Sequence, residues 1–180
     1  MGSPRRPAAH SRPHRFDTAV TRGQNTVMNA QVVQVNTSPG GVPKIPRFSG
    51  DVRVNGISGD GHTARQHGGP EKALCLYSLD RILDLQREGH PIFPGSTGEN
   101  LTIAGLPWDE IVPGDRFAIG DAVIIEITSY TAPCAKIAAS FRDEDFSRMD
   151  HETHPGWARL YARVVHEGIV RPGDRIARKG

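Results

Sequence analysis

The sequence contains few cysteines, few aromatic residues and no long hydrophobic run. Two cysteines in 180 residues are too few for a disulfide framework, so both thiols are expected to be free in a reducing compartment. No apolar stretch reaches the roughly 18 residues that a membrane-spanning helix needs, and the N-terminus lacks the apolar core of a secretory signal. The sequence therefore predicts a cytoplasmic protein without a membrane partner.

Two common catalytic motifs are also missing. The chain has no GxSxG nucleophile elbow and no GxGxxG dinucleotide fingerprint. Their absence disfavours a serine hydrolase and a Rossmann-type oxidoreductase.

Positive charge is concentrated at the N-terminus. Residues 1–27 hold five arginines and one aspartate, which leaves 17 basic and 19 acidic residues in the rest of the chain. Such a balance offers no broad positive field to a polyanion, so nucleic acid is not an expected partner. Residues 1–27 are also rich in proline and polar residues, which predicts a disordered tail before a single domain over residues 28–180.

Glycine and proline are plentiful, with 20 and 14 residues, which favours short strands joined by turns. Two Pro-Gly-Asp turns should each precede a strand, and Gly120-Asp121 should bend a hairpin. The predicted strand segments are residues 31–36, 51–57, 99–106, 116–130, 159–168 and 170–178. The predicted fold class is mainly β, a barrel with a few peripheral helices.

Two helices are expected. The first should begin at an N-cap, Ser78, end at Gly89, and bury Leu79, Ile82 and Leu83. The second is predicted within residues 135–149 of the sequence.

Cys134 lies in the stretch SYTAPCAKIAASF. Pro133 should end the preceding strand, and a helix beginning just after it would place the thiol at a helix N-terminus. There the macrodipole and nearby Lys136 would favour a thiolate, which serves as a nucleophile, a sulfur carrier or a soft-metal ligand. The alternative is a small buried hydrophobic residue, which is also the role expected of Cys75.

A glycine-rich stretch, GDGHTARQHGGP, holds Asp60, Arg65 and His67. Glycines allow a ligand to approach the backbone, and Arg and His supply donors to an anion. A turn-rich surface loop remains the alternative, and the spacing of the histidines gives little support to a zinc site. Cys134 with His67 and Asp60 would also make a cysteine hydrolase.

Two further loops carry polar groups. SPGGVPK could present Lys44 and backbone N–H groups to an anion, although it lacks the spacing of a nucleotide-phosphate loop. PGSTGENL gathers Ser96, Thr97, Glu99 and Asn100. Ordinary turns explain either loop when it is taken alone.

Taken in order, six stretches resemble the MOSC domain, named after the C-terminal region of molybdenum cofactor sulfurases. They are SPGGVPK, GDGHTARQHGGPEKALCLY, PGSTGENLTI, VPGDRFAIGDAVIIEIT, APCAK and VRPGD, and the resemblance runs from about residue 31 to residue 178. The resemblance implies a β-barrel like that of a pyruvate kinase domain, and a role around molybdenum cofactor (molybdopterin). The family is also associated with pyridoxal phosphate.

The hallmark cysteine of the family matches Cys134. The resemblance implies that Cys134 ligates molybdenum in an oxidoreductase that reduces N-hydroxylated compounds, with His67 or Asp60 supplying a proton. The alternative is a carrier of sulfur, as a Cys134 persulfide, or of the cofactor. A small-molecule substrate and a separate electron-donor reductase or sulfur donor would then be the partners.

Several reductase relatives carry an arginine shortly before the Pro-Cys pair, where this chain has Tyr130 and Thr131. Cofactor binding is therefore expected to use other groups. The cofactor-binding candidates are Lys44, Arg53, Arg65, Gly68, Gly69, Glu99, Asn100, Thr131 and Lys136.

Overall fold

The structure, a computed structural model, describes residue 2 and residues 29–61 and 68–180. Within these residues an eight-stranded sheet has the order β11-β7-β8-β9-β5-β6-β1-β2. Its strands are β1 (Gln31–Thr37), β2 (Ile45–Arg47), β5 (Leu74–Ser78), β6 (Leu101–Ala104), β7 (Arg116–Ile119), β8 (Val123–Tyr130), β9 (Leu160–His166) and β11 (Ile176–Lys179). A smaller sheet has the order β10-β3-β4, with β10 (Gly168–Val170), β3 (Gly50–Arg53) and β4 (Gly56–Ile57). The predicted mainly β class is confirmed.

The large sheet curves until its two sides meet. The N–H of Val32 in β1 donates to the carbonyl of Asp174 at 2.9 Å, and the N–H of Ile176 in β11 donates to the carbonyl of Ala30 at 2.8 Å. A single bridge between Gln31 and Arg175 joins them. The sheet therefore wraps around the core as a barrel closed by a short contact rather than by a full ladder.

The two Pro-Gly-Asp turns form matching units. The Asp115 carboxylate accepts the N–H of Val112 at 2.9 Å, and the Asp174 carboxylate accepts the N–H of Arg171 at 2.7 Å. Each turn leads into a strand, as predicted, and the two strands, β7 and β11, pair with each other in an antiparallel ladder.

The predicted hairpin at Gly120-Asp121 is also confirmed, since β7 and β8 pair around it. Residues 51–57 differ from the prediction of one alternating strand. They form β3 and β4 of a tight hairpin, with Val52 opposite Ile57. Val54 therefore lies at the turn and is exposed.

The first predicted helix is present as α1 (Leu79–Arg87). The hydroxyl of Ser78 accepts the N–H of Arg81 at 3.3 Å, which caps the helix start. Its buried residues are Ile82 and Leu85, so the predicted burial of Leu83 is wrong. The helix returns the chain to the same end of the sheet, so β5 and β6 run parallel.

The second predicted α-helix is wrong. Residues 135–149 form three short 3₁₀ helices, η3 (Ala135–Ser140), η4 (Arg142–Glu144) and η5 (Ser147–Met149). Phe141 is extended (φ −127°), and Asp143 and Glu144 have φ of 58° and 55°. A continuous helix cannot pass through these conformations. Two more 3₁₀ helices, η1 (Pro70–Lys72) and η2 (Trp108–Glu110), complete the described elements.

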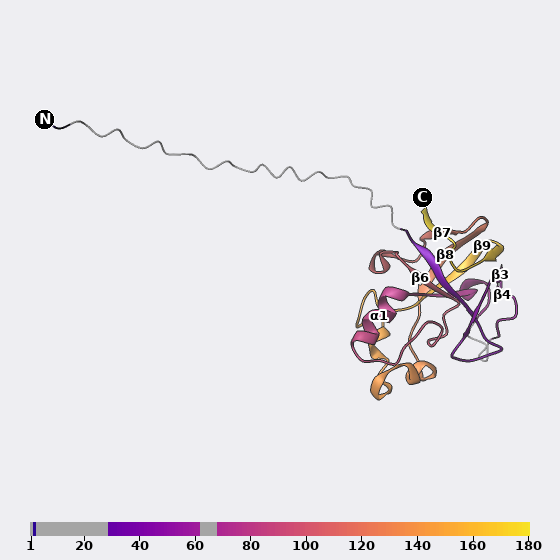
Figure 1. The fold of residues 1–180 in the computed structure, drawn as a ribbon. Coiled ribbons are helices and arrows are strands. Elements are labelled where there is room, and N and C mark those ends of the chain that lie inside the picture. Colours follow the sequence, from indigo (N-terminus) through magenta and orange to yellow (C-terminus); the bar gives the residue numbers. More distant parts are fainter. Residues whose placement is uncertain (1, 3–28, 62–67) are drawn as a thin grey trace.

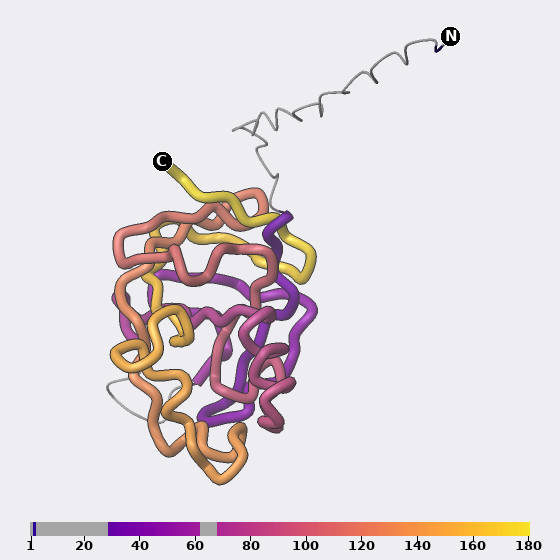
Figure 2. The backbone as a smooth tube through the Cα atoms, turned by 90° about the vertical axis from the view of Figure 1, so that its left-hand side faces the viewer, coloured from indigo at the N-terminus to yellow at the C-terminus, as the bar shows by residue number. Residues whose placement is uncertain are grey.

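The core fills the space inside the curved sheet and beneath α1. Tyr77, Leu101, Ile103, Ile125 and Ile127 are among its fully buried side chains. In Figures 1 and 2 the C-terminus and the start of β1 lie at one end of the molecule, and the orange 3₁₀ segments lie at the other. In the part of the chain that the structure describes, no helix is long and apolar enough to cross a membrane.

Candidate functional site

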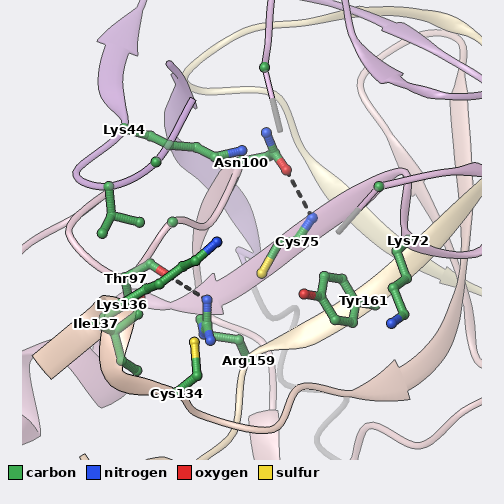
Figure 3. A pocket seen from close by; sticks show the side chains of 15 residues that line it. Lys44, Lys72, Cys75, Thr97, Asn100, Cys134, Lys136, Ile137, Arg159 and Tyr161 are labelled. Carbon is green, nitrogen blue, oxygen red and sulfur yellow. Dashed lines mark hydrogen bonds between the residues drawn. The ribbon is translucent and has the colours of Figure 1, made fainter. Parts of the chain in front are cut away.

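An open pocket brings together segments that are far apart in the sequence. Its walls come from the loop before β2, from the segments around Cys75 and Thr97, and from the chain that enters η3 and β9 (Figure 3). It holds about 650 Å³ of space, including the part that opens to solvent.

The walls of the pocket are strongly cationic. Lys44, Lys72, Lys136 and Arg159 line it, and none of the described residues that line it is an aspartate or glutamate. A wall with this charge attracts anions, and the effect is strengthened where low-dielectric walls focus the field.

Cys134 lies on the wall at the start of η3. Its backbone is extended (φ −149°, ψ 166°), and its side chain does not cap the helix. The expectation of an α-helix N-terminus behind the thiol is wrong, because η3 is a 3₁₀ helix of six residues. The thiol is half-buried and free, so it is accessible from the pocket.

Cys75 also lines the pocket, which its sequence context did not suggest. It lies in β5 with 6% of its surface exposed, as expected of a buried thiol. Asn100 fixes this part of the strand, since its side-chain oxygen accepts the Cys75 N–H at 3.0 Å. Burial raises the pKa of the Cys75 thiol, so this residue is neutral at neutral pH.

Lys44 and Asp60 form a buried ion pair beside the pocket, with side chains 9% and 1% exposed. The Asp60 carboxylate also accepts the N–H of Ser38 at 2.9 Å and the side-chain amide of Asn100 at 2.8 Å. These contacts tie together three loops. The proposed proton transfer by Asp60 stays a prediction, and its contacts favour a structural role.

Two glycines permit the close approach of these loops. The N–H of Gly61 donates to the carbonyl of Ser38, and a Cβ at Gly61 would lie 2.0 Å from the carbonyl oxygen of Pro39. Gly95 has φ +89°, and a Cβ there would lie 2.3 Å from the carbonyl oxygen of Lys44. The backbone near the pocket is therefore packed more closely than any side chain would allow.

Arg159 reaches the pocket from the residue just before β9. It is 7% exposed, and its Nη1 donates to the carbonyl of Thr97. Its Nε is buried and has no hydrogen-bond partner. A buried donor without an acceptor costs about 1–3 kcal/mol, so this guanidinium is held in place at a free-energy cost.

Glu99 lies behind the pocket wall and is completely buried. Its carboxylate accepts the N–H of Gly95 and the hydroxyls of Thr97 and Thr102, at 2.5, 2.9 and 3.2 Å. Burial raises its pKa, and the hydrogen bonds oppose that rise. Glu99 therefore organises the loop 95–99 from inside and does not contact the pocket.

Tyr161, in β9, also lines the pocket. Its pKa is raised to about 12, chiefly by burial; Cys75 and Cys134 also raise it, and Arg159 lowers it. Its hydroxyl therefore keeps its proton at neutral pH.

The structure brings together five of the predicted site residues: Lys44, Gly68, Asn100, Cys134 and Lys136 line the pocket. Five others do not line it, among them Asp60 and Glu99, whose buried carboxylates are described above. Gly69 precedes η1, Thr131 is buried and donates its N–H to the carbonyl of Arg159 at 2.9 Å, and Arg53 is exposed. His67 and Arg65 lie outside the described residues.

Arg53 is placed away from the pocket by its own ion pairs. Its guanidinium contacts Asp51 at 2.9 Å and Glu167 at 3.2 Å on the surface. Both carboxylates raise the pKa of Arg53 through hydrogen bonds. Nothing in the structure brings this residue to a ligand in the pocket.

The sequence interpretation missed Arg159, Tyr161 and Lys72 as lining residues. The alternating pattern of β9 predicts which side chains point to the core, and it gives no sign that Arg159, just before the strand, points inward. Lys72 closely follows the glycine-rich segment. Its closeness to that segment was the one sequence signal that could have identified it as a lining residue.

The fold and the pocket define a curved β-sheet protein that presents an accessible thiol to a cavity lined by cationic side chains. The family model for the MOSC domain matches residues 63–177. The chain belongs to the MOSC domain family.

Three relatives show how far the similarity extends. The uncharacterized protein YflK of Bacillus subtilis is 34% identical over 67% of this chain and 54% of YflK. A protein named reductase, from Gibberella moniliformis, is 30% identical over 69% of this chain and 22% of that protein. The chain thus matches about half or less of these relatives' length. The crystal structure of YiiM from Geobacillus stearothermophilus superposes with a TM-score of 0.66, at 26% identity, over 84% of this chain and 75% of YiiM.

Proposed function

We propose that this protein binds molybdenum cofactor in the cationic pocket and reduces N-hydroxylated compounds, with Cys134 as the protein ligand to molybdenum. The observation that carries the proposal is an accessible thiol on the wall of a pocket that Lys72, Lys136 and Arg159 line, with no carboxylate among the described lining residues. Membership of the MOSC family and a relative named reductase support it.

The residues present fit such a cofactor. Sulfur is a soft ligand that suits molybdenum, and Cys134 is the more accessible of the two thiols on the wall. The buried Nε of Arg159 lacks an acceptor, and the cationic wall suits a phosphate. Gly41, Gly61, Gly68 and Gly98 also line the pocket and leave room for a ligand to approach the backbone.

When bound, the cofactor supplies two-electron chemistry at the metal. The overall reaction consumes an N-hydroxylated compound, two electrons and two protons, and releases the reduced nitrogen compound and water. A separate reductase is expected to deliver the electrons. Tyr161 lines the same pocket, and its hydroxyl keeps its proton at neutral pH because burial raises its pKa to about 12.

Metal content tests the proposal most directly. We expect protein expressed in a molybdenum-replete host to contain molybdenum by elemental analysis, and Cys134→Ala to lose most of it. Cys75→Ala is the matched control, because it removes the other thiol on the wall and should retain the metal. Wild-type protein without molybdenum, or full retention by Cys134→Ala, would contradict the proposal.

A carrier is the second candidate function. The observation that favours it is the presence of two thiols on one pocket wall, since a sulfur atom carried as a persulfide on Cys134 would face a second sulfur. Incubation with a cysteine desulfurase and cysteine, followed by mass spectrometry, separates the two functions. A stable gain of one sulfur atom on Cys134 supports the carrier, and turnover of a hydroxylamino compound with an electron donor supports the enzyme.

A further inference from the structure

Arg159 is the least satisfied charged group of the pocket. It is 7% exposed, one of its nitrogens donates to the carbonyl of Thr97, and its buried Nε has no hydrogen-bond partner. In the part of the chain that the structure describes, no carboxylate lies within ion-pair distance of it. A buried guanidinium without a counterion is uncommon, since buried charges are normally paired.

The carboxylates closest to this region are already occupied. Glu99 accepts hydrogen bonds from Gly95, Thr97 and Thr102. Asp60 accepts them from Lys44, Ser38 and Asn100. Lys44, the other deeply buried cation on the wall, is therefore paired directly with Asp60, whereas Arg159 has no direct ion pair in the described part of the chain and acts on the Glu99 carboxylate and the Cys75 thiol only through weaker interactions.

Arg159 lines the same pocket as the accessible thiol of Cys134. Figure 3 shows the Arg159 guanidinium and the sulfur of Cys134 in the same part of the pocket, with Cys75 on β5. Both cysteines and Arg159 line one cavity. An anion that enters the pocket and accepts from Arg159 would therefore lie near the accessible thiol.

We propose that Arg159 is the anion-recognition residue of the pocket, and that it binds an oxyanionic group of the ligand, a carboxylate or a phosphate, beside Cys134. A guanidinium binds both groups through parallel N–H donors. The oxyanion supplies the counterion that the Arg159 guanidinium lacks in the described part of the chain. This inference does not depend on molybdenum, so it can hold or fail independently of the proposed function.

The test compares two alkylating reagents of nearly equal size at Cys134 in the metal-free full-length protein. Iodoacetate is a carboxylate, and iodoacetamide is its neutral analogue. The rate ratio of iodoacetate to iodoacetamide, measured by mass spectrometry of the Cys134 peptide, reports anion recognition independently of the intrinsic reactivity of the thiol. We expect this ratio to exceed that of a free cysteine peptide and to fall about fivefold in Arg159→Gln, the effect of one unit charge near an anion in a water-like dielectric.

Two variants separate recognition by Arg159 from the general field of the pocket. Arg159→Lys keeps the charge and should retain most of the ratio. Lys136→Gln removes a different cation from the same wall and should lower the ratio less than Arg159→Gln. An equal fall in Lys136→Gln, or an unchanged ratio in folded Arg159→Gln, overturns the proposal.

The wild-type protein alone provides a second measurement, which stays decisive if Arg159→Gln fails to fold. Inorganic phosphate and acetate, each compared with chloride at equal ionic strength, should slow iodoacetate labelling of Cys134 in a saturable way. Stronger protection by phosphate assigns the subsite to a phosphate group, and stronger protection by acetate assigns it to a carboxylate. No protection by either anion overturns the proposal.

Discussion

Lys44 and Asp60 form an ion pair inside the protein, although sixteen positions separate them in the sequence. The two side chains are 9% and 1% exposed, and Asn100 donates a further hydrogen bond to Asp60 at 2.8 Å. The pair joins the loop before β2 to the glycine-rich segment. It therefore holds the entrance of the pocket in shape and removes Lys44 as an independent anion binder.

Breaking this pair should be costly. We expect Asp60→Asn to lower the free energy of unfolding by about 3–5 kcal/mol, because it leaves the Lys44 charge buried without a partner. Urea denaturation measures the change. Asp84→Asn is the control, since Asp84 pairs with Arg87 at the surface and should cost less than about 1 kcal/mol. Equal losses of unfolding free energy in the two variants would show that the buried pair stabilises the protein no more than the surface pair does.

Glu99 should make stability depend on pH in the direction opposite to that of an ordinary surface carboxylate. Burial raises its pKa in the folded protein, so the folded state holds the Glu99 proton more tightly than the unfolded state. The contribution is fully present below the unfolded pKa of about 4.3 and is lost as pH rises through the raised folded value.

Glu99→Gln removes this titration. The difference in unfolding free energy between Glu99→Gln and the wild type should shift in favour of the variant as pH rises from about 4 to about 8. Urea denaturation across this range measures it, and Glu152→Gln at an exposed position serves as the control. A difference that is constant with pH would show that Glu99 titrates alike in the folded and unfolded states.

Gly95→Ala should destabilise the protein more than Gly114→Ala. Both glycines have positive φ, +89° and +97°, which costs an alanine about 1–2 kcal/mol. A Cβ at Gly95 would also lie 2.3 Å from the carbonyl oxygen of Lys44, whereas a Cβ at Gly114 meets nothing within 4 Å. Thermal denaturation of both variants isolates the clash. A smaller loss of thermal stability in Gly95→Ala than in Gly114→Ala would show that the two loops can move apart freely to relieve the clash.

The two thiols should differ sharply in reactivity. Cys134 is half-buried, whereas Cys75 is buried and its pKa is raised. We expect iodoacetamide to label Cys134 of the native protein many times faster than Cys75, and to label both at similar rates in denaturant. Peptide mass spectrometry measures each site, and Cys134→Ser should leave only the slow reaction. Fast labelling of Cys75 in that variant would contradict the burial.

Local patterns predicted much of the fold correctly. The valine-rich run of β1, the alternation in β9, the turn at Gly120-Asp121 and the cap at Ser78 all act over a few residues, where backbone preferences decide the conformation. The prediction was wrong over residues 135–149, where spacing alone suggested an α-helix. There the positive φ of Asp143 and Glu144 interrupts the helix, and the residue types in this segment do not indicate the interruption.

The candidate site was predicted in part. Short motifs identified Lys44, Asn100, Cys134 and Lys136, all of which line the pocket. They gave no means of separating Lys44, which is neutralised, from Arg159, which is not, because ion pairing depends on distances between loops. Arg53 was a reasonable candidate for the same reason. Its ion pairs with Asp51 and Glu167 hold it at the surface, away from the pocket.

The sequence by itself determined the β-rich class, the turns, the family and the cysteine on which the chemistry would depend. Each of these depends on residues that are close together along the chain. Only the tertiary structure decided that a second thiol and an unpaired guanidinium share the pocket of that cysteine. Burial and charge compensation are properties of the folded surroundings, to which the loop before β2, β5 and β9 contribute from distant parts of the chain.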